Sequence, residues 1–455
     1  MLKSLMITLV ALMMSAAAYG ASWNINGDWD GELHPGAVKL RLTFHIETIA
    51  GAVRGTMISV DQGNASIPIS SVSCNGSDVT ITVAKVGGTY HGALAEDGKS
   101  IAGSWQQRGA NLPLTLNRRA SGQVGFNLRR PQEPHPPFPY HTEDVVFGGP
   151  GGNELAGTIT IPDGAGTFPA VLLVQGSGPH DRDESTMGHK PFMVIADYLT
   201  RHGIATLRVD KRGYAKSTGN YAAATTLDFA ADAEAAGAYL KSRPEIDHAK
   251  IGLAGHSEGG MIAPIVAAKD HSIAFIVLIE APGVPGDELL MLQKRYILHA
   301  MGLPEEKIEL NLDRQKKLLA AVKPAKNSED ARARVKAALD VNSQSALASQ
   351  VNLVSSPWYL FTLNYDPAIY LRQVRCPVLA IAGGKDLQVP PKEDLAGIKA
   401  ALAKNRDAQT VELPGLNHLL QPTKTGLPSE YGEIEETIAP IALETITSWI
   451  VQHTR

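Results

Sequence analysis

The chain has 455 residues, of which 44% are hydrophobic and 19% are charged, and its formal net charge is -4. This composition excludes a disordered chain, and the length predicts more than one domain. Because the charge is nearly balanced and no run is rich in lysine and arginine, neither nucleic acid nor an anionic membrane is expected as a partner.

The first twenty residues have the pattern of a signal peptide. Lys3 supplies a positive charge, residues 5–14 form an apolar stretch, and the small residues at 18–20 are typical of a cleavage site. The apolar stretch is too short to favour a membrane span, and no later segment reaches spanning length. We therefore expect an exported protein, periplasmic or secreted, without a membrane span once residues 1–20 are removed. A retained N-terminal anchor is the alternative.

Residues 21–120 are expected to form a small antiparallel β-rich domain, either a barrel or a sandwich. Short β-like runs alternate there with Gly, Asn and Asp turns. The clearest runs are 38–46, 52–60, 78–84, 101–106 and 112–116. Such a domain either binds a ligand in its interior or is an accessory domain whose Trp and Met side chains only fill its core. We favour the second interpretation.

Residues 121–141 form a proline-rich linker, which we expect to be an extended, semi-rigid spacer. From residue 142 to 455, apolar strands alternate with helical stretches, which predicts an α/β fold with a mostly parallel eight-stranded sheet covered on both faces. The first two strands, at 144–147 and 156–161, are expected to form an antiparallel hairpin at the sheet edge. Residues 283–367 interrupt the alternation with a largely helical pattern, and we call this segment the cap.

One motif in the α/β part indicates nucleophilic catalysis. Residues 253–260 read Leu-Ala-Gly-His-Ser-Glu-Gly-Gly, a G-x-S-x-G pattern between an expected strand and an expected helix. A serine in that setting lies on a sharp turn, where the glycines allow the bend and the helix N-terminus favours developing negative charge. Ser257 is therefore the predicted nucleophile.

A serine nucleophile needs a base, and the base needs a group that orients it. Asp386 and His418 each follow a late apolar strand. Because parallel strands end at the same edge of a sheet, we expect Asp386 and His418 to meet Ser257 there as a Ser-His-Asp triad. Glu280, at the end of another strand, is the competing acid.

An acyl-transfer site also needs backbone donors for the oxyanion. Residues 175–179 read Gln-Gly-Ser-Gly-Pro and form a glycine-flanked turn after an apolar strand. We assign one donor to the N–H of Ser177, with Gly178 as the alternative, and the other to the N–H of Glu258. Ser177 is also a weak rival nucleophile, since no strand-to-helix turn frames it.

Neither a metal ion nor a disulfide is expected. The acidic run at 181–184 has no histidine ligand set at metal spacing and is interpreted as an internally salt-bridged loop. The charged turn at 210–213 is interpreted as structural pairing near the site. Cys74 and Cys376 lie in different expected domains, and Cys376 opens an apolar run in which a buried free thiol fits.

From about Thr142 to its end, the chain resembles the α/β-hydrolases, and among them the bacterial esterase D-type serine carboxylesterases. The resemblance rests on Gly-Ser-Gly-Pro at 176–179, Asp-Arg-Asp-Glu at 181–184, Asp-Lys-Arg-Gly at 210–213, Gly-His-Ser-Glu-Gly-Gly at 255–260, Ser-Pro-Trp at 356–358 and Lys-Asp-Leu-Gln-Val-Pro at 385–390. It implies hydrolysis of short-chain acyl esters without a metal or organic cofactor, with Ser257, Asp386 and His418 as nucleophile, acid and base. One departure is Gln175, where many relatives have histidine. The β-rich domain lies outside the resemblance.

The expected function is therefore that of a serine carboxylesterase acting on a small-molecule ester. A serine peptidase or amidase on the same fold is the first alternative, and a ligand-binding protein with a vestigial hydrolase domain is the second. Trp358, Tyr359 and Phe361, near the end of the cap, either line the acyl pocket or anchor the cap to the sheet. The sequence carries no signal for an oligomeric state.

Overall fold

The computed structural model describes residues 24–36, 39–49, 52–61, 65–107, 109–120, 126, 129–338 and 351–455. The expected signal peptide lies outside these ranges, and so do residues 121–125 and 127–128 of the expected linker. None of the helices within the described ranges combines the length and apolarity that crossing a membrane requires.

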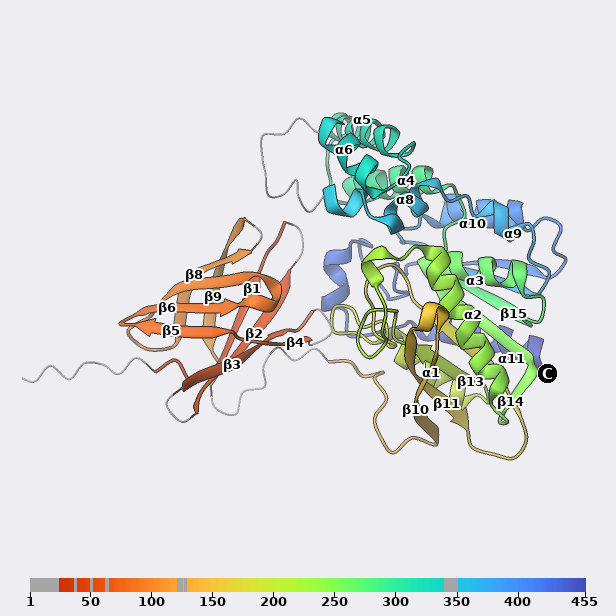
Figure 1. Cartoon of the computed structure of the whole chain (residues 1–455), viewed down its shortest axis with the longest axis horizontal. Coiled ribbons are helices and arrows are strands. Elements are labelled where there is room, and N and C mark those ends of the chain that lie inside the picture. Colours follow the sequence, from red (N-terminus) through yellow and green to blue (C-terminus); the bar gives the residue numbers. More distant parts are fainter. Residues whose placement is uncertain are drawn as a thin grey trace, which may run out of the picture.

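The first part of the chain folds into one nine-stranded antiparallel sheet (Figure 1). Its strands are β1 (Gly27–Leu33), β2 (Leu40–Ile49), β3 (Ala52–Ser59), β4 (Ala65–Pro68), β5 (Ser71–Asn75), β6 (Asp78–Val83), β7 (Gly88–Leu94), β8 (Ser100–Gln107) and β9 (Ala110–Arg118). They lie in the order 4-3-2-1-9-8-7-6-5, so only Ile69 and Ser70 separate the two edge strands. The Ile69 N–H donates to the carbonyl of Gly55 in β3 at 3.0 Å. The sheet therefore curls into a half-barrel, and the expected antiparallel β domain is confirmed without the sandwich.

The interior of the half-barrel is filled by aromatic side chains. The ring of Phe44 lies 6.3 Å from that of Tyr90 and 6.1 Å from that of Trp105, measured between centroids. The buried Tyr90 hydroxyl donates to the carbonyl of Ile101 at 2.7 Å. Mutual packing of these rings supports the interpretation that they form a core and do not line a ligand cavity.

The second part of the chain builds an eight-stranded sheet in the order 10-11-13-12-14-15-16-17. Its strands are β10 (Tyr140–Gly148), β11 (Glu154–Pro162), β12 (Phe168–Val174), β13 (Ala205–Val209), β14 (Ile246–His256), β15 (Phe275–Ile279), β16 (Val378–Gly383) and β17 (Ala408–Leu413). β10 and β11 form an antiparallel hairpin at the edge, and β11 is also antiparallel to β13. All the remaining pairs, from β13 through β12, β14, β15 and β16 to β17, are parallel. The expected mostly parallel sheet with an edge hairpin is confirmed.

Helices cover both faces of this sheet. α1 (Pro191–Arg201) and α11 (Pro440–Thr454) share one apolar cluster with Val171 and Leu173 of β12. α2 (Thr226–Ser242), α3 (Glu258–Lys269), α9 (Ala368–Leu371) and α10 (Pro391–Ala401) share the other cluster with Leu172 and Val174. Successive β12 residues thus face opposite layers, as a strand requires, and this double burial explains why the strand is apolar throughout.

The cap lies between β15 and β16 and contains α4 (Gly286–Ala300), α5 (Glu305–Val322), α6 (Ser328–Ala338) and α8 (Pro357–Asn364). These helices gather at the top of Figure 1. Much of the cap has an apolar cluster of its own, which includes Leu318, Val322, Val335, Val351, Tyr359 and Leu363. α8 begins where the Ser356 side chain accepts a hydrogen bond from the Tyr359 N–H at 3.2 Å, a common helix cap.

Two arginines connect the β half-barrel and the linker to the α/β part. Arg41, paired with the buried Asp61, donates to the carbonyl of Gly432 at 3.0 Å, and Arg130 donates to the same carbonyl at 3.0 Å. Arg130 also donates to the carbonyl of Ile434 at 2.9 Å. The half-barrel therefore contacts a segment that follows His418 along the chain.

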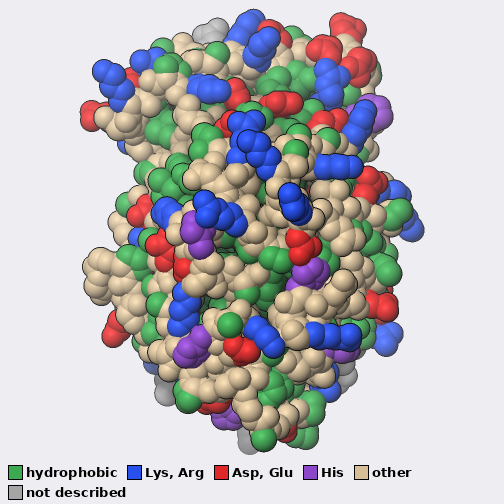
Figure 2. Space-filling view, turned by 90° about the vertical axis from the view of Figure 1, so that its right-hand side faces the viewer, with side chains coloured by type: hydrophobic (Ala, Val, Ile, Leu, Met, Phe, Trp, Pro, Cys, Tyr) green, Lys and Arg blue, Asp and Glu red, His purple; other side chains and the backbone are tan. Residues whose placement is uncertain are grey.

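Surface charges of both signs are interspersed on the face drawn in Figure 2, where blue and red side chains alternate over the cap and the body. Cys74 is exposed and Cys376 is half-buried, and both thiols are free.

Candidate active site

The predicted nucleophile lies on a strained turn between β14 and α3. Ser257 has a φ of +52° and a ψ of -112°, a backbone conformation that L-residues rarely adopt. A Cβ atom on Gly255 would lie 2.0 Å from the Gly259 carbonyl oxygen, so only glycine permits this close approach. The Ser257 N–H donates to the carbonyl of Ile279 at 2.8 Å, which fixes the turn against the neighbouring strand.

The predicted base and acid are hydrogen bonded to each other. His418 Nδ1 donates to Asp386 Oδ2 at 2.7 Å, and both residues are buried, at 6% and 1% exposure. The other Asp386 oxygen accepts from the N–H groups of Gln388 and Val389 at 2.7 and 3.0 Å. Burial alone would raise the pKa of Asp386, but His418, together with hydrogen bonds from Glu280 and the Val389 N–H, outweighs it and holds this pKa below its ordinary value. Asp386 is thus a carboxylate that fixes the His418 tautomer.

Ser257, Asp386 and His418 lie at the same edge of the sheet, because β14, β16 and β17 are parallel and each ends just before one of them. His256, next to Ser257, donates from Nε2 to the His418 carbonyl at 2.9 Å, and the two imidazole rings are 4.9 Å apart. Among the described residues, no hydrogen bond joins the Ser257 hydroxyl to the His418 ring. Such bonds are often long before substrate binds. The joint role of the three stays a prediction.

The competing acid, Glu280, lies beside Asp386. Oxygen and nitrogen atoms of Glu280, Asp386 and His418 lie within 4.8 Å of one another. Burial and the charge of Asp386 raise the pKa of Glu280 well above its ordinary value, which favours its protonated form. Although this spacing would also suit a metal ion, both Asp386 oxygens are already engaged by His418 and by backbone amides. Asp386, and not Glu280, bonds to His418.

The turn after β12 lies directly against the nucleophile. A Cβ atom on Gly176 would be 3.2 Å from the Cβ of Ser257. Within the described residues, the N–H groups of Ser177 and Glu258 donate to no other protein group. Two unpaired amides beside Ser257 suit an oxyanion hole, and this assignment also stays a prediction.

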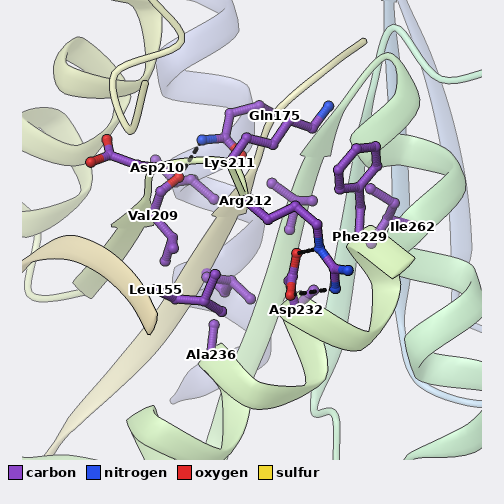
Figure 3. A pocket seen from close by; sticks show the side chains of 14 residues that line it. Leu155, Gln175, Val209, Asp210, Lys211, Arg212, Phe229, Asp232, Ala236 and Ile262 are labelled. Carbon is purple, nitrogen blue, oxygen red and sulfur yellow. Dashed lines mark hydrogen bonds and ion pairs between the residues drawn. The ribbon is translucent and has the colours of Figure 1, made fainter. Parts of the chain in front are cut away.

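Gln175 stands where many relatives have histidine, and its side chain is hydrogen bonded to two backbone carbonyls. Its side-chain amide donates to the carbonyl of Val209, at the end of β13, and to that of Asp181 at 3.2 Å. Gln175, Val209 and Lys211 lie close together in the lining of a pocket, which Figure 3 shows from close by. The glutamine therefore anchors the start of the turn to the neighbouring strand.

The three aromatic residues near the end of the cap have different surroundings. Trp358 donates from Nε1 to Glu258 Oε1 at 2.7 Å, next to Ser257. Tyr359 is buried in the apolar cluster of the cap, and the Phe361 ring lies 5.6 Å from that of Tyr365. Of the three, Trp358 has the contact that links the cap to the turn of Ser257. A pocket-lining role for them stays a prediction.

Two buried ion pairs next to Ser257 were missed from the sequence. Glu184 pairs with His256 at 3.0 Å, and Lys211 pairs with Glu258 at 2.8 Å. The acidic run at 181–184 was expected to form salt bridges within itself, but its ion-pair partners lie outside it. Arg182, for example, pairs with Asp210 at 2.8 Å. The only signal in the sequence was that charged residues follow apolar strands.

Comparison with known proteins gives the family. Residues 171–424, more than half of the chain, match the model of the alpha/beta hydrolase family. Esterase EstD of Thermotoga maritima is 28% identical over 321 residues, which cover 70% of this chain and 69% of that protein. The solved alpha/beta hydrolase GrgF from Penicillium sp. sh18 is 18% identical, with 69% of this chain and 99% of that chain covered and a TM-score of 0.45. The Pyrococcus furiosus esterase Pf2001 is 16% identical, with 70% and 94% covered and a TM-score of 0.43. The chain therefore belongs to the alpha/beta hydrolase family.

Proposed function

We propose that this protein is a carboxylesterase that works through a Ser257-His418-Asp386 triad and an acyl-enzyme. The observation that carries the proposal is the buried 2.7 Å hydrogen bond from His418 to Asp386, at the same sheet edge as the strained turn of Ser257. Asp386 holds the proton on Nδ1 of His418, which leaves Nε2 available as the base. The likeness to a protein named as an esterase, EstD, supports an ester as the substrate.

The proposed reaction has two halves. Ser257 Oγ attacks the ester carbonyl while His418 Nε2 takes the hydroxyl proton, and the N–H groups of Ser177 and Glu258 bind the oxyanion. The carbon–oxygen bond to the alcohol then breaks, and His418 returns the proton to the leaving oxygen. Water attacks the acyl-enzyme with His418 again as base, which releases the acid and restores Ser257.

The first alternative, a peptidase that reads a peptide amino terminus, needs an available carboxylate near Ser257. The sequence offers two candidates, Glu258 next to Ser257 and Glu280 at the end of β15. Glu258 accepts from Lys211 and Thr226, each at 2.8 Å, and from Trp358, so its oxygens are already engaged. Glu280 is fully buried, and its raised pKa favours the protonated form, which carries no charge. Neither suits the recognition of an amine, which favours the esterase.

The test compares p-nitrophenyl esters of increasing acyl length with an aminoacyl p-nitroanilide. We expect faster ester turnover, with short acyl chains preferred. Ser257→Ala is expected to lose the activity, whereas Ser242→Ala, at an exposed serine at the end of α2, keeps it. Faster turnover of the anilide would overturn the esterase proposal, and an active Ser257→Ala would overturn the triad.

We also propose that the protein is exported and that residues 1–20 are removed. The charge at Lys3 and the small residues before Ala21 support this. N-terminal sequencing of the protein expressed with its leader is expected to begin at Ala21. A mature chain that still begins at Met1 would contradict export with cleavage.

A further inference from the structure

The turn that carries Ser177 is held on both sides at one residue, Gly176. The Gly176 N–H donates to Glu184 Oε1 at 2.5 Å, and its carbonyl accepts from Lys211 Nζ at 2.6 Å. Each partner is ion-paired with a neighbour of Ser257, Glu184 with His256 and Lys211 with Glu258. The ion-pair partners of the two residues that flank Ser257 therefore hold both polar backbone groups of Gly176.

These four side chains are buried, since Glu184, Lys211, His256 and Glu258 have exposures of 3%, 6%, 8% and 3%. A buried ion pair adds little net stability, because the cost of removing both charges from water offsets their attraction. Stability alone therefore does not explain two such pairs at one residue. Their shared target, the backbone of Gly176, points to a role in the geometry of the turn.

The geometry of the peptide unit connects Lys211 to the oxyanion hole. The carbonyl of Gly176 and the N–H of Ser177 belong to the same peptide unit, which is planar and trans. They therefore point in opposite directions, and holding the carbonyl toward Lys211 fixes the direction of the Ser177 N–H. Once the Gly176 N–H is also held by Glu184, the turn cannot rotate about this residue without breaking a buried hydrogen bond.

We propose that Lys211, held by Glu258, is a positioning residue that aims the Ser177 N–H at the oxyanion. This inference rests on the proposed esterase function. The Lys211 ammonium donates to Gly176 and Glu258, and it lies 4.4 Å from the ring centroid of Phe229. The ammonium is thus surrounded by an acceptor, a counter-ion and an aromatic face, so it acts through the backbone and not as a proton donor to substrate.

The Glu258 carboxylate connects Lys211 to the cap through hydrogen bonds. Its Oε2 accepts from Lys211, and its Oε1 accepts from Thr226 and from the Trp358 indole. The side chain of Glu258 thereby joins the turn, α2 and the cap, while its backbone N–H is the second expected oxyanion donor. Both donors of the hole are fixed by one ion pair.

The test replaces Lys211 by methionine, which keeps the length of the side chain but removes the cation and its donors. We expect kcat for p-nitrophenyl acetate to fall by about 10- to 100-fold with little change in KM, because a lost oxyanion donor costs about 100-fold or more. A trifluoromethyl ketone, which forms a tetrahedral adduct with an active-site serine, is expected to bind the variant more weakly by a similar factor. A role in packing alone would not weaken the adduct selectively.

Arg212→Met is the matched control. Arg212 follows Lys211 and pairs with Asp232 at 2.6 Å (Figure 3), and its hydrogen bonds go to Asp232 and the Asp228 carbonyl, not to Gly176. We expect this variant to keep kcat and ketone affinity near the wild type. Equal kcat and equal ketone affinity in Lys211→Met and Arg212→Met would overturn the positioning role.

If Lys211→Met does not fold, Glu258→Gln is tested, since it keeps the side-chain size but removes the counter-ion of Lys211. A lower kcat at unchanged KM supports the proposal, and an unchanged kcat overturns it. The failure of the proposed function is distinguishable, because it would appear as full ester hydrolysis by Ser257→Ala, whatever the Lys211 variants do.

Discussion

His256 hydrogen bonds through Nε2 to the backbone carbonyl of His418 at 2.9 Å, so the residue before the expected nucleophile supports the loop of the expected base. The other ring nitrogen of His256 faces Glu184 at 3.0 Å. Burial alone would lower the pKa of His256, but the Glu184 carboxylate, together with the His418 carbonyl and the charge of Asp386, outweighs it and holds this pKa above its ordinary value of 6.5. His256 therefore links the two loops, and its raised pKa favours the charged form.

His256→Gln is expected to change how stability depends on pH. Because the folded state raises the pKa of His256, its contribution to stability is complete below pH 6.5 and is lost as the pH rises through the folded pKa. Relative to the variant, the wild type should lose stability above pH 6.5. Urea unfolding of both proteins at several pH values measures this difference. A constant difference across the range would show that His256 is uncharged in the fold.

Asp386→Asn is expected to lower kcat by roughly 10³- to 10⁴-fold, since it removes the charge that fixes and stabilises the His418 imidazolium. Glu280→Gln is the matched control, because Glu280 is already neutral and glutamine has nearly the same shape. We expect this variant to stay close to the wild type in ester hydrolysis. A large loss in Glu280→Gln together with a small loss in Asp386→Asn would identify Glu280 as the acid.

Asp394→Asn is expected to stabilise the protein at high pH. Asp394 Oδ1 accepts from the N–H groups of Gly283 and Val284 at 2.7 and 3.2 Å, while its buried Oδ2 has no hydrogen-bond partner in the described part of the chain. Burial raises the pKa of Asp394 from 3.8 to about 7. Its contribution to stability is therefore complete below pH 3.8 and is lost as the pH rises to 7, by roughly 4 kcal/mol.

Thermal unfolding of the wild type and Asp394→Asn at pH 5 and pH 8 measures this effect. The variant should gain in Tm relative to the wild type at the higher pH. If the Tm difference between the two proteins is the same at both values, Asp394 titrates normally and the expectation is wrong.

Arg130→Ala is expected to destabilise the protein by roughly 2 to 4 kcal/mol, because it leaves several carbonyl groups without their donor. These are the carbonyls of Met187, Gly188 and Ile434. Arg129→Ala is the control, since Arg129 is 69% exposed and its contact with Glu435 is 3.9 Å long. Denaturant unfolding gives both values, and limited proteolysis should show earlier cleavage between residues 428 and 434 only in Arg130→Ala. Equal stability of the two variants would contradict the anchoring role.

The sheet and the edge at which Ser257, Asp386 and His418 lie were predictable because parallel strands buried on both faces leave long apolar runs. Turn residues then mark where each run ends. The half-barrel was less predictable, since alternation with a period of two fits a barrel and a sandwich equally. The curling of the sheet into a half-barrel depends on the short connection at Ile69 and Ser70, which joins its two edge strands.

The ion pairs around Gly176 were not predictable from the sequence. Glu184 and His256 are 72 positions apart, and Lys211 and Glu258 are 47 positions apart. No local periodicity relates such residues, and their pairing depends on how the loops after neighbouring strands fold over one edge. The sequence indicated charged turns there without indicating which charges meet.

The most direct test of the triad is mass-spectrometric mapping of the protein after reaction with a fluorophosphonate. We expect one adduct per chain, on the peptide that contains Ser257, and no adduct in Ser257→Ala. Slower labelling is expected in Asp386→Asn, because the variant lacks the carboxylate that orients His418. An adduct on Ser177, or ester hydrolysis that continues without any adduct on Ser257, would contradict the triad.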